Sequence, residues 1–110
     1  MTAAKPVVPR ERAERDVEDI VDHFVRGAGL EVALRFIDAY GSVCARISAQ
    51  PGAGSPRFGW ELDLPGLRAW QIRGFGHLVF YVERADVIDV WRVVHTARDI
   101  PHWLSEPAEE

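Results

Sequence analysis

The sequence predicts a two-layer α+β fold, in which an N-terminal antiparallel helix hairpin packs on a small antiparallel sheet. Two observations carry this prediction. In the first half of the chain, apolar residues recur at the spacing of amphipathic helices. In the second half, short runs of β-branched and aromatic residues are separated by turn residues. The expected order of elements is β-α-α-β-β-β, followed by a short C-terminal helix or tail.

Length and composition fit one small domain. The chain has 110 residues, and 47% of them are hydrophobic, including four tryptophans. That content is enough for a real core and excludes wholesale disorder. We expect a single domain over residues 1–106 and a disordered tail at 107–110.

The first helix is expected to follow a short edge strand. Val7-Val8 is an apolar pair that Pro9 ends, and from Arg10 the apolar period becomes helical. Gly27-Ala28-Gly29 ends this helix, as glycine does at helix C-termini. Its apolar face comprises Ala13, Val17, Ile20, Val21 and Phe24.

A second helix follows the glycine link directly. Its apolar stripe comprises Ala33, Phe36, Ile37, Tyr40, Val43, Cys44 and Ile47, and Gln50-Pro51-Gly52 ends it. Because the link between the helices is so short, they must run antiparallel.

The second half of the chain predicts a three-strand meander. Residues 51–66 are rich in glycine and proline and are expected to form a long loop that lies on the core. The strands are expected at Leu67–Ile72, His77–Val82 and Val87–His95, and their tight links imply antiparallel pairing. Ile100–Glu106 would form the final short helix or tail.

One face of this sheet is expected to remain partly bare. The helix hairpin covers only one face, so the other would expose apolar members of the strand sets. Those sets are Arg68/Trp70/Ile72 and Leu78/Phe80/Val82. A partner segment would then be needed to cover the surface.

Charge and cysteine usage narrow the class of protein. The net charge of −4 disfavours direct DNA binding by this chain, because phosphate contacts need Lys and Arg. Cys44 is the single cysteine, which excludes an intramolecular disulfide and suits a reducing cytoplasm. The N-terminus lacks the apolar run of a signal peptide, and no segment has the roughly 20 apolar residues of a membrane span.

No cofactor or metal is expected. His95 and His102 lack a Cys/His cluster around them, so their spacing does not match a zinc ligand set. Gly74–Gly76 lies in a hairpin, whereas a nucleotide fingerprint lies between a strand and a helix.

Polar residues on or after the strands are the candidates for function, and each also has a structural interpretation. They are Arg68, Arg73, His77, Arg92, His95, Arg98, Asp99, His102 and Trp103. Arg68 and Arg73 are either solvated or paired with Glu61, Asp63 or Glu83. Arg92 lies within an apolar strand and needs a carboxylate, either Asp99 or a helix acid. His95 is also explained as a structural imidazole.

The order of the strands and the string Arg92-Val93-Val94-His95-x-x-Arg98-Asp99 resemble the ParE branch of the RelE/ParE toxin superfamily. The resemblance extends from about Val8 to Leu104. It implies the toxin of a type II toxin–antitoxin system. Such a toxin poisons DNA gyrase by protein contact, is held inactive by a ParD-like antitoxin and is not an enzyme.

The RelE branch is the alternative. Its members resemble ribosome-dependent mRNA endonucleases, with lysines and arginines on the strands and an arginine and a tyrosine or histidine near the C-terminus. Here no lysine lies on the second strand, and no tyrosine follows Arg98. A nuclease would have to use Arg98 with His77, His95 or His102. A toxin-derived scaffold without killing activity is a third possibility.

The resemblance to ParE also gives expected contact residues. Target-binding candidates are Arg68, Arg73, Arg92, Arg98 and Trp103. Antitoxin-binding candidates are Phe24, Phe36, Tyr40, Trp70 and Phe80.

Overall fold

The computed structural model describes residues 4–97 and 100–104, and for Trp103 the backbone alone. Its elements are β1 (Val7–Pro9), α1 (Glu11–Gly27), α2 (Leu30–Ala49), the 3₁₀ turn η1 (Pro51–Ala53), α3 (Arg57–Glu61), β2 (Leu67–Ile72), β3 (His77–Glu83), β4 (Ile88–His95) and α4 (Ile100–Leu104). The predicted α+β order, with a short C-terminal helix, is confirmed. The expected tail at 107–110 lies outside the described residues.

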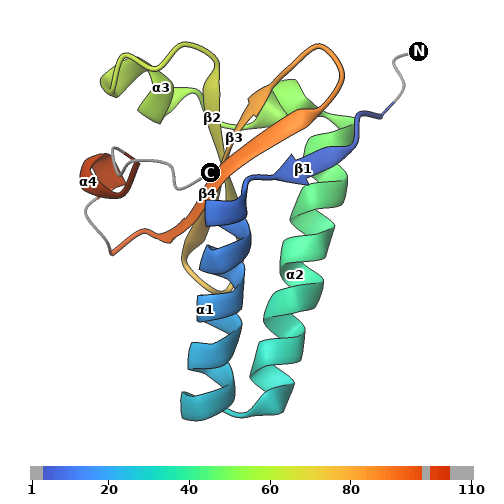
Figure 1. Ribbon diagram of the computed structural model, residues 1–110, viewed down its shortest axis with the longest axis vertical. Coiled ribbons are helices and arrows are strands. Elements are labelled where there is room, and N and C mark those ends of the chain that lie inside the picture. The colour runs from blue at the N-terminus through green and yellow to red at the C-terminus, as the bar shows by residue number, and fades with distance from the viewer. Residues whose placement is uncertain (1–3, 98–99, 105–110) are drawn as a thin grey trace.

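The two long helices form the predicted hairpin. Figure 1 shows α1 and α2 side by side, with their connected ends projecting past the strands. At the end of α1 the amides of Ala28 and Gly29 both donate to the carbonyl of Phe24, at 2.8 and 2.9 Å. Gly29 then adopts a φ of 100°, a conformation that glycine reaches without a steric cost. The chain therefore reverses within a single short link.

The sheet is mixed, not antiparallel throughout. Its strand order is β1-β4-β3-β2, and the β2–β3 and β3–β4 pairs are antiparallel as predicted. The short strand β1 joins the edge parallel to β4, with Val7 opposite Ile88. Parallel neighbours need a long connection, which the chain between Pro9 and Ile88 supplies.

The main core lies between the helix hairpin and one face of the sheet. Its buried members are Ala13, Phe36, Val43, Ile47, Ile72, Val79, Tyr81, Ile88, Val90 and Val93. The predicted helix stripes thus supply one side of the core, except Ile37, which is 43% exposed, and alternate strand residues supply the other side.

The other face of the sheet is covered as well, which corrects the expectation of a bare face. Phe58 of α3 packs edge-on against Phe80 with ring centroids 5.3 Å apart, and Phe80 is fully buried. Ile100 of α4 joins the same cluster. Trp70 and Ile72 instead pack into the helix-side core, opposite the face that holds Phe80. The short helices α3 and α4 supply this cover; a C-terminal helix or tail was expected, but α3 and the packing of both helices on the sheet were not.

The segment 51–66 lies on the core as predicted but is not a plain loop. The hydroxyl of Tyr81 donates to the carbonyl of Pro51 at 2.7 Å, and the amide of Ser55 donates to the carbonyl of Ala69 at 2.9 Å. Between these anchors and β2 the chain forms α3, five residues long.

A glycine inside α3 gives a stability prediction. A Cβ on Gly59 would lie 2.6 Å from the carbonyl oxygen of Leu67 and 3.0 Å from that of Leu64. Both are backbone atoms that cannot swing aside, so Gly59→Ala is expected to lower the free energy of unfolding by about 1–3 kcal/mol. Urea titration followed by circular dichroism measures this change. Gly52→Ala is the matched control, because a Cβ there meets no atom within 4 Å; equal losses in both variants would contradict the explanation.

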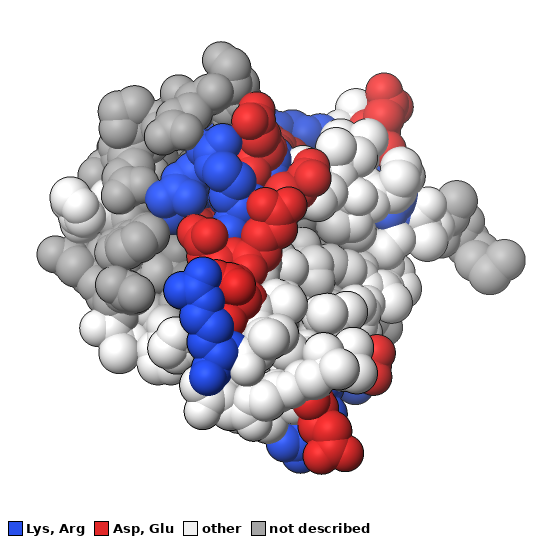
Figure 2. All heavy atoms as spheres, turned by 60° about the horizontal axis from the view of Figure 1, so that its bottom comes forward, with Lys and Arg blue, Asp and Glu red and all other residues white. Residues whose placement is uncertain are grey.

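The charges of α1 are largely paired along the helix itself. Arg15 pairs with Glu11 at 3.1 Å and Arg26 with Asp22 at 2.6 Å, each one turn apart. Such exposed pairs stabilise a helix by only a few tenths of a kcal/mol. Figure 2 shows acidic and basic side chains gathered in one band of the surface, with largely uncharged surface beside it.

Candidate functional site

Arg92 is a structural residue, held by an acid of α1. Its guanidinium donates from Nε to Oδ2 of Asp16 at 2.8 Å and from Nη2 to Oδ1 at 2.9 Å. The amide of Val93 also donates to Asp16 Oδ2 at 2.9 Å. Both partners are 5% exposed. A helix acid, one of the two predicted partners for Arg92, is therefore observed, and the pair joins α1 to β4 within the fold. The other predicted partner, Asp99, lies outside the described residues.

The two arginines near β2 differ in accessibility. Arg68 donates from Nη1 to the carbonyl of Gly54 at 2.7 Å, so it holds the 51–66 segment. It makes no ion pair with Glu61, Asp63 or Glu83 among the ion pairs of the described residues. Arg73, at the β2–β3 turn, is exposed. Arg73 is therefore the more accessible of the two to a partner.

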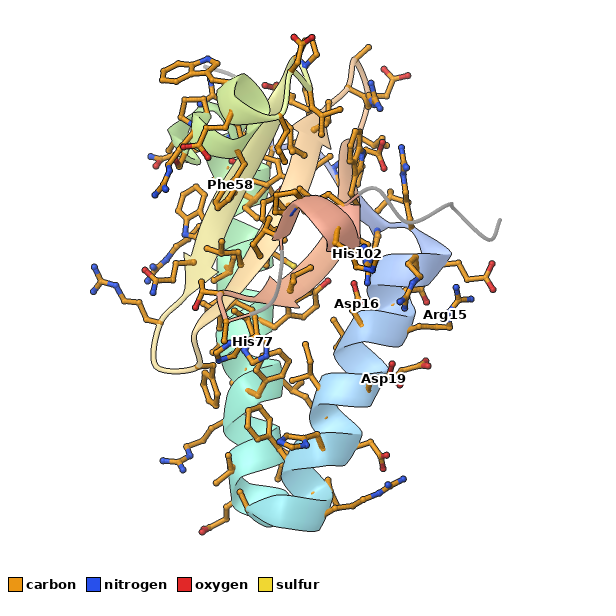
Figure 3. All side chains as sticks on the ribbon, turned by 90° about the vertical axis from the view of Figure 1, so that its left-hand side faces the viewer. Arg15, Asp16, Asp19, Phe58, His77 and His102 are labelled. Atoms are coloured by element: carbon orange, nitrogen blue, oxygen red, sulfur yellow. The ribbon has the colours of Figure 1, made fainter. Side chains whose placement is uncertain are left out.

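A hollow of the surface lies between α1 and the ends of β3 and β4. Its volume is about 480 Å³, and a smaller hollow of about 140 Å³ shares several of its walls. Figure 3 shows Asp16 and Asp19 on α1 and His77 at the end of the sheet. The lining residues are Asp16, Asp19, Ile20, His23, Phe24, Phe75, His77, Val93, Val94 and His95.

Two predicted histidines meet in this hollow. The rings of His77 and His95 are perpendicular, with centroids 4.9 Å apart. Nδ1 of His95 accepts a hydrogen bond from the amide of Ala97 at 2.9 Å, so the proton of the neutral ring lies on Nε2. His77 is 7% exposed and also contacts the ring of Phe36 at 5.3 Å. Burial, and then the charge that His95 carries when protonated, lowers the pKa of His77 to about 4.

The chemistry of the hollow is poorly suited to phosphate. None of the described residues that line it is Lys or Arg, and two are aspartates. A phosphate-cleaving site needs cations beside the developing charge. The described residues also contain no group of three or more His, Cys, Asp or Glu side chains that could hold a metal ion.

The C-terminal candidates are only partly described. Arg98 and Asp99 lie outside the described residues, and so does the side chain of Trp103. His102 lies on α4, away from His77 (Figure 3). The structure thus brings His77 and His95 together but does not bring His102 to them.

The aromatic candidates fall into two groups. Phe36 and Phe80 are fully buried, so neither side chain offers surface to a partner in this structure. Phe24, Tyr40 and Trp70 are half-buried and keep part of their surface accessible. Burial raises the pKa of Tyr40, so its hydroxyl stays protonated.

None of the helices in the ranges 4–97 and 100–104 is long and apolar enough to cross a membrane.

Comparison with known proteins places this arrangement in a family. A family model described as the ParE toxin of the parDE type II toxin–antitoxin system matches residues 7–100. The chain belongs to the ParE toxin family. A solved structure described as the chromosomal ParDE toxin–antitoxin system from P. aeruginosa has the same fold, with a TM-score of 0.70 and 21% sequence identity. The likeness covers 86% of this chain and 98% of that one. No curated protein sequence matches the chain.

The string that resembled the ParE branch has a structural core. Its first residue, Arg92, is buried against Asp16, and Val93 and Val94 are buried on opposite faces of β4. In this ParE-family chain the first half of the string therefore holds α1 and the sheet together.

Sequence reasoning missed three residues that line the hollow. Asp16, Asp19 and His23 all lie on α1, of which the apolar face alone was singled out from the sequence. A signal was present for His23, because it is three residues from Ile20 and so shares its face. For Asp16 the need of Arg92 for a carboxylate was the only signal.

Proposed function

We propose that this protein is the toxin of a type II toxin–antitoxin pair, that it inhibits DNA gyrase by protein contact, and that a ParD-like antitoxin neutralises it. Its action would take place in the cytoplasm. The observation that carries the proposal is the match to the ParE toxin model over residues 7–100. The structural likeness to a ParDE system supports the fold in which such a toxin is built.

The histidine hollow supports contact over catalysis. His77 is neutral near pH 7, because its pKa is lowered to about 4, and it is almost fully buried. The carboxylate of Asp19 shares the hollow and would repel a phosphate, whereas that of Asp16 is paired with Arg92. The RelE-like nuclease has one observation in its favour, the contact between His77 and His95. That pair brings no Lys or Arg side chain to the scissile phosphate.

We assign gyrase contact to the accessible basic and aromatic residues. Arg73 is exposed at the β2–β3 turn, and Arg98 and Trp103 remain candidates by their place in the sequence. Arginine and tryptophan are frequent anchors of protein interfaces. Arg68 would contribute less, because it is engaged with Gly54, and Arg92 is buried.

We assign antitoxin contact to the half-buried aromatics Phe24, Tyr40 and Trp70. Acidic side chains of the antitoxin would meet the arginines of this chain. Because both faces of the sheet are already covered, the antitoxin would add to a finished domain, not complete an unfinished core.

Expression in cells tests the proposal. Production of the chain without an antitoxin is expected to arrest growth with DNA damage, while bulk mRNA stays intact. Co-expression of a ParD-like protein from the neighbouring reading frame is expected to restore growth. Arg73→Ala, Arg98→Ala and Trp103→Ala are expected to reduce killing by about tenfold or more while the protein stays folded, since interface anchors commonly contribute 1–2 kcal/mol or more.

Arg57→Ala is the matched control for these variants, because Arg57 is exposed on α3 and its ion pair is with Glu61 of the same helix. Primer extension that reveals codon-positioned mRNA cleavage within minutes of induction would refute the gyrase assignment. Normal growth at high expression would instead point to a scaffold that has lost killing activity.

A further inference from the structure

Helix α2 carries an apolar stripe on the surface, beside the face that packs in the core. Leu30, Leu34 and Ile37 are 63%, 51% and 43% exposed. Gly41 and Ala45 continue the stripe at intervals of four residues and are also exposed. A Cβ on Gly41 would meet no atom within 4 Å. The side chains of the stripe are therefore large in the first half of the helix and small in the second half.

Four charged residues follow one side of this stripe, and they are not used within the fold. Glu31, Arg35, Asp38 and Arg46 are all exposed. None of them makes an ion pair with another described residue, although Glu31 and Arg35 are one turn apart. On α1, by contrast, such one-turn pairs are formed.

We infer that α2 binds α2 of a second copy of this chain, antiparallel, about a two-fold axis near Ile37. This register places Leu34 against Gly41 of the partner subunit and Leu30 against Ala45 of the partner subunit. Each large side chain then meets a small one, and the symmetry repeats both contacts. The stripe from Leu30 to Ala45 is about 22 Å long at 1.5 Å per residue, enough for two helices to pack along it.

The charges fit the same register. In an antiparallel pair the same flank of each helix faces the other, so Arg35 lies beside Asp38 of the partner subunit. Glu31 likewise lies within reach of Arg46 of the partner subunit. In a symmetric parallel pair the two charged flanks would instead lie on opposite sides of the pair, so these charges would not meet. Apolar size and charge therefore select the same orientation independently.

The shape of the molecule leaves this face accessible. The connected ends of α1 and α2 project past the strands (Figure 1), so the first half of the stripe is clear of the sheet. A second copy is favoured over a foreign helix because the complementarity is between α2 and itself. The inference goes beyond the proposed toxin function and does not depend on it.

Sedimentation velocity of the full chain alone, over a range of concentrations, tests the inference. We expect a monomer–dimer equilibrium. Arg35→Glu is expected to weaken it at least tenfold, because a glutamate would then face Asp38 of the partner subunit. The double variant Arg35→Glu/Asp38→Arg is expected to restore dimerisation, because both pairs are reversed together. Arg57→Glu, a charge reversal on α3, is the control and should leave the equilibrium unchanged.

Gly41→Leu separates dimerisation from folding. Within one chain the new side chain occupies open space, and leucine is a better helix former than glycine. The melting temperature should therefore not fall. Against Leu34 of the partner subunit it would clash, and the dimer should be lost. A monomer at every concentration, or no rescue by the double variant, would overturn the inference. So would a Leu34→Glu variant that stays dimeric and loses antitoxin binding instead, since α2 would then be an antitoxin site.

Discussion

Asp16→Asn is expected to lower the free energy of unfolding by about 3–5 kcal/mol, the range typical when one partner of a buried ion pair is removed. Asp16 accepts two hydrogen bonds from Arg92 and one from the amide of Val93, and both side chains are 5% exposed. Without the carboxylate, the buried guanidinium of Arg92 would lose the opposite charge that both of these hydrogen bonds bring to it. Chemical denaturation of the purified variant measures the loss.

Two further variants make this prediction specific. Asp19→Asn removes an exposed carboxylate from the same helix and should cost well under 1 kcal/mol. The double replacement Asp16→Leu/Arg92→Met removes both charges, and it should recover most of the stability lost in Asp16→Asn. If Asp16→Asn proves as mild as Asp19→Asn, the ion pair does not join α1 to β4 as described.

A second large change in the free energy of unfolding is expected when the pH is lowered. The pKa of His77 is about 4 in the folded chain, against an ordinary value of 6.5. Between these values the unfolded chain binds more protons than the folded one, so stability rises with pH in that window. The contribution of His77 is therefore full above about pH 6.5 and is lost as the pH falls toward about 4. The shift corresponds to about 3 kcal/mol.

Carboxylates titrate in the same range, and Asp16 and Asp19 face the same hollow as His77. The test is therefore a difference between proteins. Unfolding free energies are measured from pH 4 to pH 7 for the wild-type chain, His77→Gln and His102→Gln. The pH dependence should be flatter in His77→Gln and unchanged in His102→Gln, whose side chain is exposed. Equal slopes in all three would contradict the assignment.

The long elements could be predicted because their signal is local. The strand Leu67–Ile72 was expected with the bounds observed. Helix α1 ends at the glycine link that was expected to end it, and α2 ends directly before Gln50-Pro51-Gly52, as expected. Elements that depend on distant contacts were harder to predict. The short helix α3 contains Gly59 and follows Pro56, so its sequence reads as a loop until Phe58 packs on Phe80. The parallel pairing of β1 likewise rests on its contact with β4.

In the candidate site, too, single residues could be predicted from the sequence, whereas the contacts between them could not. That Arg92 needs a carboxylate followed from its apolar strand, but α1 offers several acids. The packing of α1 on β4 decides that Asp16 is the partner. The sequence also marked His77 and His95 separately; their contact depends on the register of β3 and β4, in which they are opposite each other.

The central claim is that this ParE-family chain acts on gyrase by contact, and one measurement tests it most directly. The purified chain is added to DNA gyrase and relaxed plasmid DNA, with and without the ParD-like antitoxin. Supercoiling is expected to be lost, with accumulation of cleaved gyrase–DNA complexes, and full protection is expected when the antitoxin is added first. Unaffected supercoiling at high toxin concentration, together with mRNA cleavage when the same preparation is added to translating ribosomes, would contradict this claim.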